Sequence, residues 1–268
     1  KYITVSTSIG NMTRVATDEK GGQTFEEGDE ISVYAWTGDA TVAPETRERV
    51  VNNAINKLTN GSWVSTPQML WKNNRDKHYF IGVYPISAIS DLSAGEYTFD
   101  ETKQVESDLL VAVNKDGLSY NVDEQQPVPL TFTHVMAKLV VNLTYKNQWG
   151  GIPTVEKVVV GNAAKEATIN YLTKVVTPST TAKEDFSLPE ITENTKYVSV
   201  IIPQEDVKQL TIVIGGKNFV YDNGTPFKLE SGKITTVNLE VGRDEIKLGD
   251  VKITDWENGS TFKGEALN

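Results

Sequence analysis

Apolar and polar residues alternate over short stretches of this chain, and long helical periodicity is rare. Runs rich in Val, Ile, Thr and Tyr recur throughout and are separated by Gly, Asn, Asp and Pro. β-Branched and aromatic residues favour strands, and the separating residues favour turns, so the pattern predicts many strands joined by turns. The clearest predicted strands span residues 30–36, 78–84, 108–113, 129–145, 155–160, 197–202, 210–214, 217–221 and 234–241.

Two of these strands show which of their faces belongs to the core. In residues 137–144, one face carries Leu139, Val141 and Leu143. The other face carries Lys138, Val140, Asn142 and Thr144. Residues 235–241 repeat the pattern with an apolar row of Val237, Leu239 and Val241. Because successive side chains of a strand point to opposite faces, we expect the apolar rows to be buried and the polar rows to face solvent.

Turn residues define the hairpins. Gly215-Gly216 lies between two apolar runs and predicts a two-residue hairpin turn. Residues 46–58 are ambiguous, because their apolar positions have helical spacing while Asn60-Gly61, directly before residues 62–64, is typical of a hairpin. We expect a hairpin here, with a short helix as the alternative.

A polar stretch at residues 123–127 ends in Pro127 and suggests a boundary near the middle of the chain. It predicts two domains, residues 1–126 and 127–268. A chain of 268 residues is long enough to bury a substantial core in each half. We therefore expect an all-β protein built as two β-sandwich domains.

Composition excludes several classes of function. The chain has no cysteine, which excludes disulfides, thiol nucleophiles and Cys-ligated metals within it. Its formal net charge is −10, so repulsion opposes binding to nucleic acids and anionic lipids. No segment approaches the roughly 18 consecutive apolar residues that a membrane helix needs. We expect no nucleic-acid partner.

Candidate catalytic groups are few. The two histidines, His78 and His134, lie in strand contexts, and neither has a second histidine at metal-ligand spacing. Neither a Gly-x-Ser-x-Gly nucleophile motif nor a glycine-rich phosphate loop followed by a helix occurs. Acidic pairs such as Asp100-Glu101 lie near turns, where carboxylates are usually solvated. We expect no enzyme, no cofactor and no metal; a glycosidase or protease on a β-sandwich scaffold is the least favoured alternative.

Five tryptophans leave a second binding function open. Trp36, Trp63, Trp71, Trp149 and Trp256 are expected mainly to fill or cover sandwich cores. Exposed tryptophans stack on sugars, however, and neighbouring carboxylates accept sugar hydroxyl protons. A surface glycan-binding lipoprotein is therefore the alternative to a structural or adhesive protein.

Short pieces of the sequence, spread in order along nearly the whole chain, together form a family signature. These are residues 13–15, 25–34, 71, 79–85, 108–112, 130–143, 202–204, 232–239 and 251–259. The most specific piece is 130–143, with the sequence LTFTHVMAKLVVNL, and the last reads VKITDWENG. Taken together and in this order, they resemble the fimbrillin-like subunits of the type V pili of Bacteroidetes.

The resemblance implies a fold and a way of assembling. The expected fold is two transthyretin-like, Greek-key β-sandwiches of about seven strands each. Export as a lipoprotein, through a cysteine upstream of Lys1, would place the protein on the outer membrane or in surface fimbriae. Other pilin subunits would be its partners by donor-strand exchange, and an adhesive subunit would also bind a host or bacterial surface ligand.

In that mechanism an arginine-specific protease removes the first strand, and a strand from a neighbouring subunit fills the groove that remains. Arg14 is the candidate processing site by position. The candidate removable strand carries Tyr2, Ile3 and Val5, and its alternation with Thr4 and Ser6 suits an edge strand. An ordinary first strand is the alternative.

The C-terminal stretch offers a candidate donor strand. Residues 245–253 alternate, with apolar positions at Ile246, Leu248, Val251 and Ile253. This stretch could equally close its own domain. Because only a short polar segment follows Trp256, the sequence favours a tip or accessory subunit over a polymerising stalk subunit.

Overall fold

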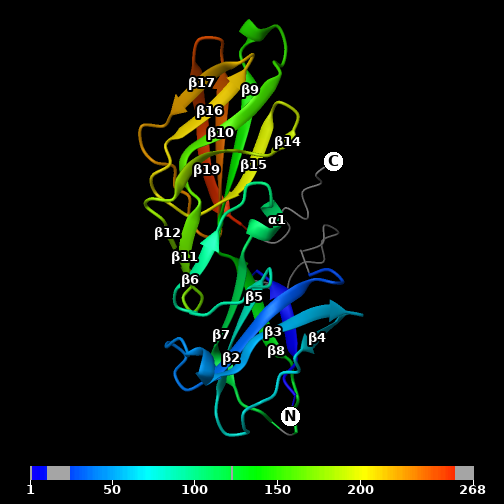
Figure 1. Cartoon of the computed structure of the whole chain (residues 1–268). Coiled ribbons are helices and arrows are strands. Elements are labelled where there is room, and N and C mark those ends of the chain that lie inside the picture. Colours follow the sequence, from blue (N-terminus) through cyan, green and yellow to red (C-terminus); the bar gives the residue numbers. More distant parts are fainter. Residues whose placement is uncertain (1, 11–24, 122, 257–268) are drawn as a thin grey trace.

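The computed structural model describes residues 2–10, 25–121 and 123–256. They form an almost entirely β structure, which confirms the predicted fold class. Figure 1 shows two groups of strands stacked end to end, with the small sheet of β6, β11 and β12 where they meet. In this part of the chain, no helix is long and apolar enough to cross a membrane.

A seven-stranded sheet forms the first group. Its order is β1 (Val5–Ile9), β8 (Val128–His134), β7 (Leu110–Leu118), β5 (His78–Tyr84), β2 (Glu30–Thr37), β3 (Arg49–Thr59) and β4 (Ser62–Thr66). All pairs are antiparallel except β1 with β8, which is parallel. The first strand of the chain therefore lies at one edge of this sheet and β4 at the other.

The central strands of this sheet are buried on both faces. In β2, Val33 and Ala35 pack into one core while Tyr34 and Trp36 pack into another. The first core lies within the seven-stranded sheet, and the second continues into the other half of the molecule. A strand covered on both sides reads as a near-continuous apolar run, which is how residues 31–36 appear in the sequence.

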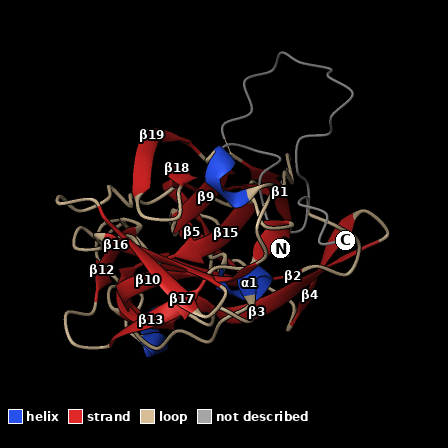
Figure 2. Ribbon diagram, turned by 90° about the horizontal axis from the view of Figure 1, so that it is seen from above, coloured by secondary structure: helices blue, strands red, loops and turns tan. Residues whose placement is uncertain are grey.

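The second group is a sandwich of two sheets. One is β14 (Glu190–Thr192), β15 (Lys196–Ile201), β9 (Ala137–Tyr145), β18 (Lys233–Val241) and β19 (Ile246–Asp255). The other is β13 (Lys183–Ser187), β10 (Val155–Ala164), β16 (Gln209–Ile214) and β17 (Lys217–Asp222). Figure 2 shows the two layers. Leu139 and Val237 from the first sheet share a core with Val160 and Ile212 from the second, so the predicted apolar rows are buried.

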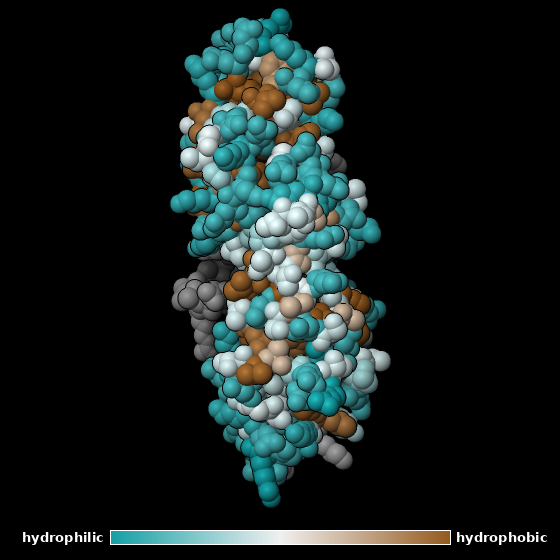
Figure 3. Space-filling model, turned by 60° about the vertical axis from the view of Figure 1, so that its left-hand side comes forward, coloured by the Kyte–Doolittle hydropathy of each residue, from teal (hydrophilic) through white to brown (hydrophobic). Residues whose placement is uncertain are grey.

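A small sheet lies between the groups, in the order β12 (Val175–Pro178), β11 (Glu166–Asn170) and β6 (Gly95–Thr98). The helical elements are short: η1 (Thr46–Glu48), α1 (Gln104–Ser107) and η2 (Asn147–Trp149). On the face shown in Figure 3, apolar residues form several patches separated by polar ones.

The predicted strand 129–145 is two strands, which corrects that expectation. β8 ends at His134 and β9 begins at Ala137, and the two strands belong to different sheets. Val135 and Met136 are buried between them, and the Val135 N–H donates to the Leu109 carbonyl at 3.0 Å. The run reads as continuous because residues on both sides of the break are buried and apolar.

The domain division at residues 126 and 127 stays a prediction. β8 follows that point in the sequence but completes the sheet of the first half. β6 precedes it and pairs with β11 of the second half. Each half of the chain therefore contributes a strand to the other.

Residues 46–58 form a strand in a hairpin, as expected, and only η1 is helical. Asn60 and Gly61 connect β3 to β4 with φ of 51° and 72°, a conformation that Asn and Gly adopt most readily. Gly215 and Gly216 likewise connect β16 to β17, with φ of 59° and 70°.

Lys138 corrects the predicted polar face of β9. Its side chain is 1% exposed, and Val140 on the same face is 8% exposed. Trp256 lies against this face, with its ring centroid 5.5 Å from the Lys138 ammonium. Alternation alone does not reveal that another part of the chain covers the polar face.

Candidate functional site at the two terminal strands

The first strand is an integral part of its sheet. β1 runs parallel to β8 in a register that pairs Val5 with Val128 and Ile9 with Phe132. Backbone hydrogen bonds continue beyond the strand at both ends: the Val128 N–H donates to the Thr4 carbonyl at 2.8 Å, and the Gly10 N–H donates to the Phe132 carbonyl at 2.7 Å. β1 thereby satisfies the backbone groups along the edge of β8.

The predicted first-strand residues divide between core and solvent. Ile3, Val5 and the later residue Ile9 are 3%, 6% and 6% exposed and belong to the core within the seven-stranded sheet. Burial of such side chains contributes about 1.5–3 kcal/mol each. Tyr2 is 56% exposed and forms an isolated antiparallel bridge with Leu70. Next to it, the Ile3 N–H donates to the Met69 carbonyl at 2.9 Å.

β1 also contacts the opposite edge of its own sheet. Trp63 lies on β4, yet its indole N–H donates to the Thr7 hydroxyl of β1 at 3.0 Å. The sheet is therefore rolled, so that its two edges approach each other. Phe25 packs inside with its ring 5.4 Å from Trp63 and 5.1 Å from Phe132.

A groove would remain if β1 were absent. Opposite β1, Val128, Leu130 and Phe132 are at most 1% exposed. Without β1, their strand would have an unpaired backbone edge beside apolar side chains, which is the arrangement that accepts an added strand. Arg14, the candidate processing site, lies outside the described residues, in the segment 11–24 that connects β1 to the rest of the chain.

The last strand, β19, pairs with its own sheet along its whole length. It is antiparallel to β18, and an extra residue, Gly249, forms a bulge where the register shifts. The bulge brings all four apolar positions of the candidate donor strand onto one face, opposite inward-facing residues of β18. The pairs are Ile246 with Val241, Leu248 with Leu239, Val251 with Val237, and Ile253 with Thr235.

These side chains are nevertheless poorly covered. Leu248, Val251 and Ile253 are 40%, 37% and 39% exposed. β19 lies at the edge of its sheet. Ion pairs supplement the backbone ladder, including Lys233 with Asp255. Such exposed pairs contribute little to stability.

Trp256, directly after β19, is buried. It is 5% exposed and stacks on His134 at the end of β8, with ring centroids 3.9 Å apart and an interplanar angle of 6°. The Lys138 ammonium lies 5.5 Å from the indole centroid. His134 is itself fixed by Asp108, whose carboxylate lies 2.7 Å from the imidazole Nδ1. The sequence suggested a core role for tryptophans in general, but nothing in it paired Trp256 with His134.

The other histidine has a structural environment. His78 is buried; its Nε2 accepts from the Lys72 N–H at 3.1 Å, and its Nδ1 faces the Asp76 carbonyl at 3.0 Å. Burial lowers the pKa of His78 below its ordinary value, so the imidazole is held neutral. Among the described residues, no group of three or more His, Asp or Glu side chains is placed to hold a metal ion.

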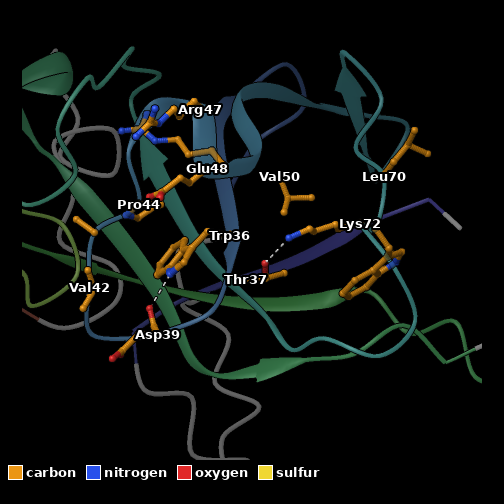
Figure 4. Close-up of a pocket in the computed structure, with 13 residues that line it drawn as sticks. Trp36, Thr37, Asp39, Val42, Pro44, Arg47, Glu48, Val50, Leu70 and Lys72 are labelled. Carbon is orange, nitrogen blue, oxygen red and sulfur yellow. Dashed lines mark hydrogen bonds between the residues drawn. The ribbon is translucent and has the colours of Figure 1, made fainter.

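A surface pocket of about 760 Å³ is lined by Trp36, Trp71, Asp39 and Glu48 among others, and Figure 4 shows Trp36 beside Asp39. Trp36 is only 2% exposed, and its indole N–H donates to the Asp39 carbonyl at 2.9 Å. The Asp39 side chain accepts from Thr41, and the Glu48 side chain accepts from the Glu45 N–H. The polar groups that a sugar would need are thus engaged in local turns, so the pocket adds little support to the glycan-binding alternative.

Comparison with known proteins identifies the class of protein. A sequence model described as fimbrillin-like matches residues 13–256, and the chain belongs to this family. A search of curated proteins found no match.

Solved structures share the fold. A putative cell adhesion protein from Bacteroides uniformis aligns with a TM-score of 0.71 and 19% identity, covering 95% of this chain and 98% of that one. One from Bacteroides ovatus gives 0.68 and 19%, covering 96% and 98%. The tip fimbrial protein Mfa3 from Porphyromonas gingivalis gives 0.55 and 11%, covering 86% and 95%.

Proposed function

We propose that this protein is a structural or adhesive subunit of type V fimbriae on the cell surface, and that it joins other pilin subunits by exchanging terminal strands. The observation that carries the proposal is the position of β1. This strand lies at a sheet edge and pairs with a strand that would otherwise present a free edge, and with Ile3 just before it, it contributes Val5 and Ile9 to the core. Family membership supports the same function.

In the proposed mechanism, an arginine-specific protease cuts after Arg14 and separates β1 covalently from the rest of the chain. β1 is then held only by its backbone hydrogen bonds and its buried side chains. A strand from a neighbouring subunit replaces it, because the incoming strand restores both the hydrogen bonds to β8 and the burial of the core.

The candidate donor strand is β19, with Ile246, Leu248, Val251 and Ile253 along one face. Ile246 with Leu248, and Val251 with Ile253, each have the two-residue spacing of Ile3 and Val5, and the bulge at Gly249 would have to persist in the groove to keep both pairs on one face. In the present structure β19 is paired over its whole length with β18. While it is paired in this way β19 fills no neighbour's groove, as in a tip or accessory subunit, and it would have to leave its sheet to act as a donor.

We place the protein outside the cell, anchored to the outer membrane by a lipid on a cysteine preceding Lys1. Two of the similar structures are described as putative cell adhesion proteins and one as a tip fimbrial protein, which supports this location. An adhesive role would add a host or bacterial surface ligand.

Limited digestion with an arginine-specific protease tests the mechanism, with Arg14→Lys as the matched control. We expect the first cut to follow Arg14, so that the mass under denaturing conditions falls by residues 1–14. Under native conditions the fragment should stay bound, because β1 is buried. A labelled peptide of residues 246–256 should then replace it in cut wild-type protein and fail to bind the uncut Arg14→Lys variant.

Two results would contradict the proposal. One is a digest in which the described arginines, such as Arg47 or Arg75, are cut while Arg14 stays intact. The other is a cleanly cut protein that keeps its first strand in the presence of a large excess of peptide.

A further inference from the structure

The attachment of β19 to its sheet is uneven along its length. Every side chain from Lys247 to Asp255 is exposed, and only Trp256, the residue that follows, is buried. At its other end β19 continues from β18 through a tight turn, in which the Gly242 N–H donates to the Glu245 carbonyl at 2.8 Å. The two ends are thus held differently, one by the chain connection and one by a tryptophan ring.

Trp256 occupies the position where opening of β19 would begin. A hairpin strand frays from the end opposite its turn, because the turn keeps the near end in place. In this hairpin the far end is at Lys233 and Asp255, which pair directly before Trp256. Side chains of β19 bury little surface, so beside the backbone ladder the burial of one large aromatic ring is the main side-chain contribution that opposes opening.

The site that receives the ring is rigid. Trp256 stacks on His134, which Asp108 fixes, and the backbone N–H of Trp256 donates to the Gly232 carbonyl at 2.9 Å. The Gly232 N–H in turn donates to the Met136 carbonyl at 2.9 Å. This site lies where the chain passes from β8 to β9, and so between the seven-stranded sheet and the sheet that contains β19.

We propose that Trp256 is the anchor that keeps β19 on its own sheet, and that its departure from His134 is the step that frees β19 as a donor strand. The first part stands on the geometry alone. The second part rests on the proposed function. Opening would stay local, because β18 keeps its parallel pairing with β9 after β19 has left.

Hydrogen–deuterium exchange on the full chain tests the anchor. In Trp256→Ala we expect the backbone amides of β19 to exchange at least about tenfold faster than in the wild type, while β9 and β5 keep their protection. The matched control is Trp63→Ala, which removes a tryptophan of β4 whose indole N–H donates to Thr7 of β1. That variant should accelerate exchange in β1 and leave β19 unchanged.

Trp256→Phe covers the case in which the alanine variant fails to fold. A phenyl ring can still stack on His134, so this variant should retain most of the protection of β19. The anchor is ruled out if β19 exchanges at the wild-type rate in Trp256→Ala. It is equally ruled out if every strand of the sandwich loosens to the same degree in both the alanine and phenylalanine variants.

A mixing experiment separates the anchor from strand exchange. Wild-type protein cut after Arg14 serves as acceptor, uncut wild type or Trp256→Ala as donor, and size-exclusion chromatography follows the rate of dimer formation. We expect the variant donor to form dimers at least about tenfold faster, the factor expected for the amide exchange of β19. Equal rates would overturn the anchor and leave strand exchange standing. Faster amide exchange without dimers from either donor would overturn strand exchange and leave the anchor standing.

Discussion

The first and last strands lie at sheet edges and have similar alternating sequences, but they are held in opposite ways. β1, with Ile3 just before it, buries Val5 and Ile9 in the core of a rolled sheet. β19 turns Leu248, Val251 and Ile253 toward the same side as the buried row of β18, yet leaves each more than a third exposed. Side chains hold β1, whereas the backbone ladder and Trp256 hold β19.

Because of this difference, the two strands are suited to different roles in strand exchange. Departure of β1 would expose its own apolar side chains together with Leu130 and Phe132. The free energy required is a large fraction of the stability of a folded protein, so spontaneous departure is rare. Departure of β19 would expose mainly a backbone edge. A strand like β1 is suited to being replaced by an equivalent strand, and a strand like β19 is suited to moving.

The largest expected effect on stability comes from truncating one isoleucine in each strand, which tests whether β1 is packed more tightly than β19. Ile9→Ala removes a buried side chain from β1 and should lower the free energy of unfolding by about 2–5 kcal/mol. Ile253→Ala removes the same atoms from a side chain that is 39% exposed and should cost less than about 1 kcal/mol. Urea denaturation followed by tryptophan fluorescence measures both. Equal losses would show that β19 is packed as tightly as β1.

A smaller loss of stability should follow from adding a methyl group at Gly82, against the side chains of β8. Gly82 of β5 has no side chain, and a Cβ there would lie 2.6 Å from the Phe132 ring and 3.1 Å from Leu130. Gly82→Ala should therefore displace the Phe132 ring next to β1 and cost about 1–3 kcal/mol.

Gly161→Ala on β10 is the control for Gly82→Ala, because its nearest neighbour would lie at an ordinary 3.4 Å. Thermal unfolding compares the two variants, and amide exchange should show the loss concentrated in β1 for Gly82→Ala. If both variants have the melting temperature of the wild type, Phe132 is packed loosely, and the core next to β1 is not as tight as we infer.

Much of the fold could be predicted from alternation and turn residues. The hairpin at Asn60-Gly61 and the inward row of Val237, Leu239 and Val241 depend on local chemistry, and both are found. The break between β8 and β9 could not be predicted, because Val135 and Met136 are as apolar as the strands they join. Lys138 was assigned to a polar face because a sequence does not show which other part of the chain covers a strand.

The processing and donor roles of the terminal strands stay predictions. Alternation predicted that Ile3 and Val5 share one face, and both are buried, whereas the row along β19 depends on a bulge that alternation does not reveal. The bulge at Gly249, the rolled sheet that brings Trp63 to Thr7, and the stack of Trp256 on His134 join residues far apart in the chain. Such contacts depend on tertiary packing, which a single sequence does not display.

The smallest expected effect is a pH dependence confined to the neighbourhood of β1. Neutral His78 accepts from the Lys72 N–H, and the segment just before Lys72 pairs with Tyr2 and Ile3. Because burial lowers the pKa of His78 below 6.5, the unfolded chain binds a proton that the folded chain resists as the pH falls through 6.5. Stability from this group is complete above that pH and decreases below it, by at most about 1.4 kcal/mol per pH unit. The urea midpoint should therefore fall more between neutral and mildly acidic pH in the wild type than in His78→Gln. At the lower pH, amide exchange of the wild type should become faster in β1 and stay unchanged in β19. The same pH dependence in both proteins would show that His78 does not hold this end of the first strand.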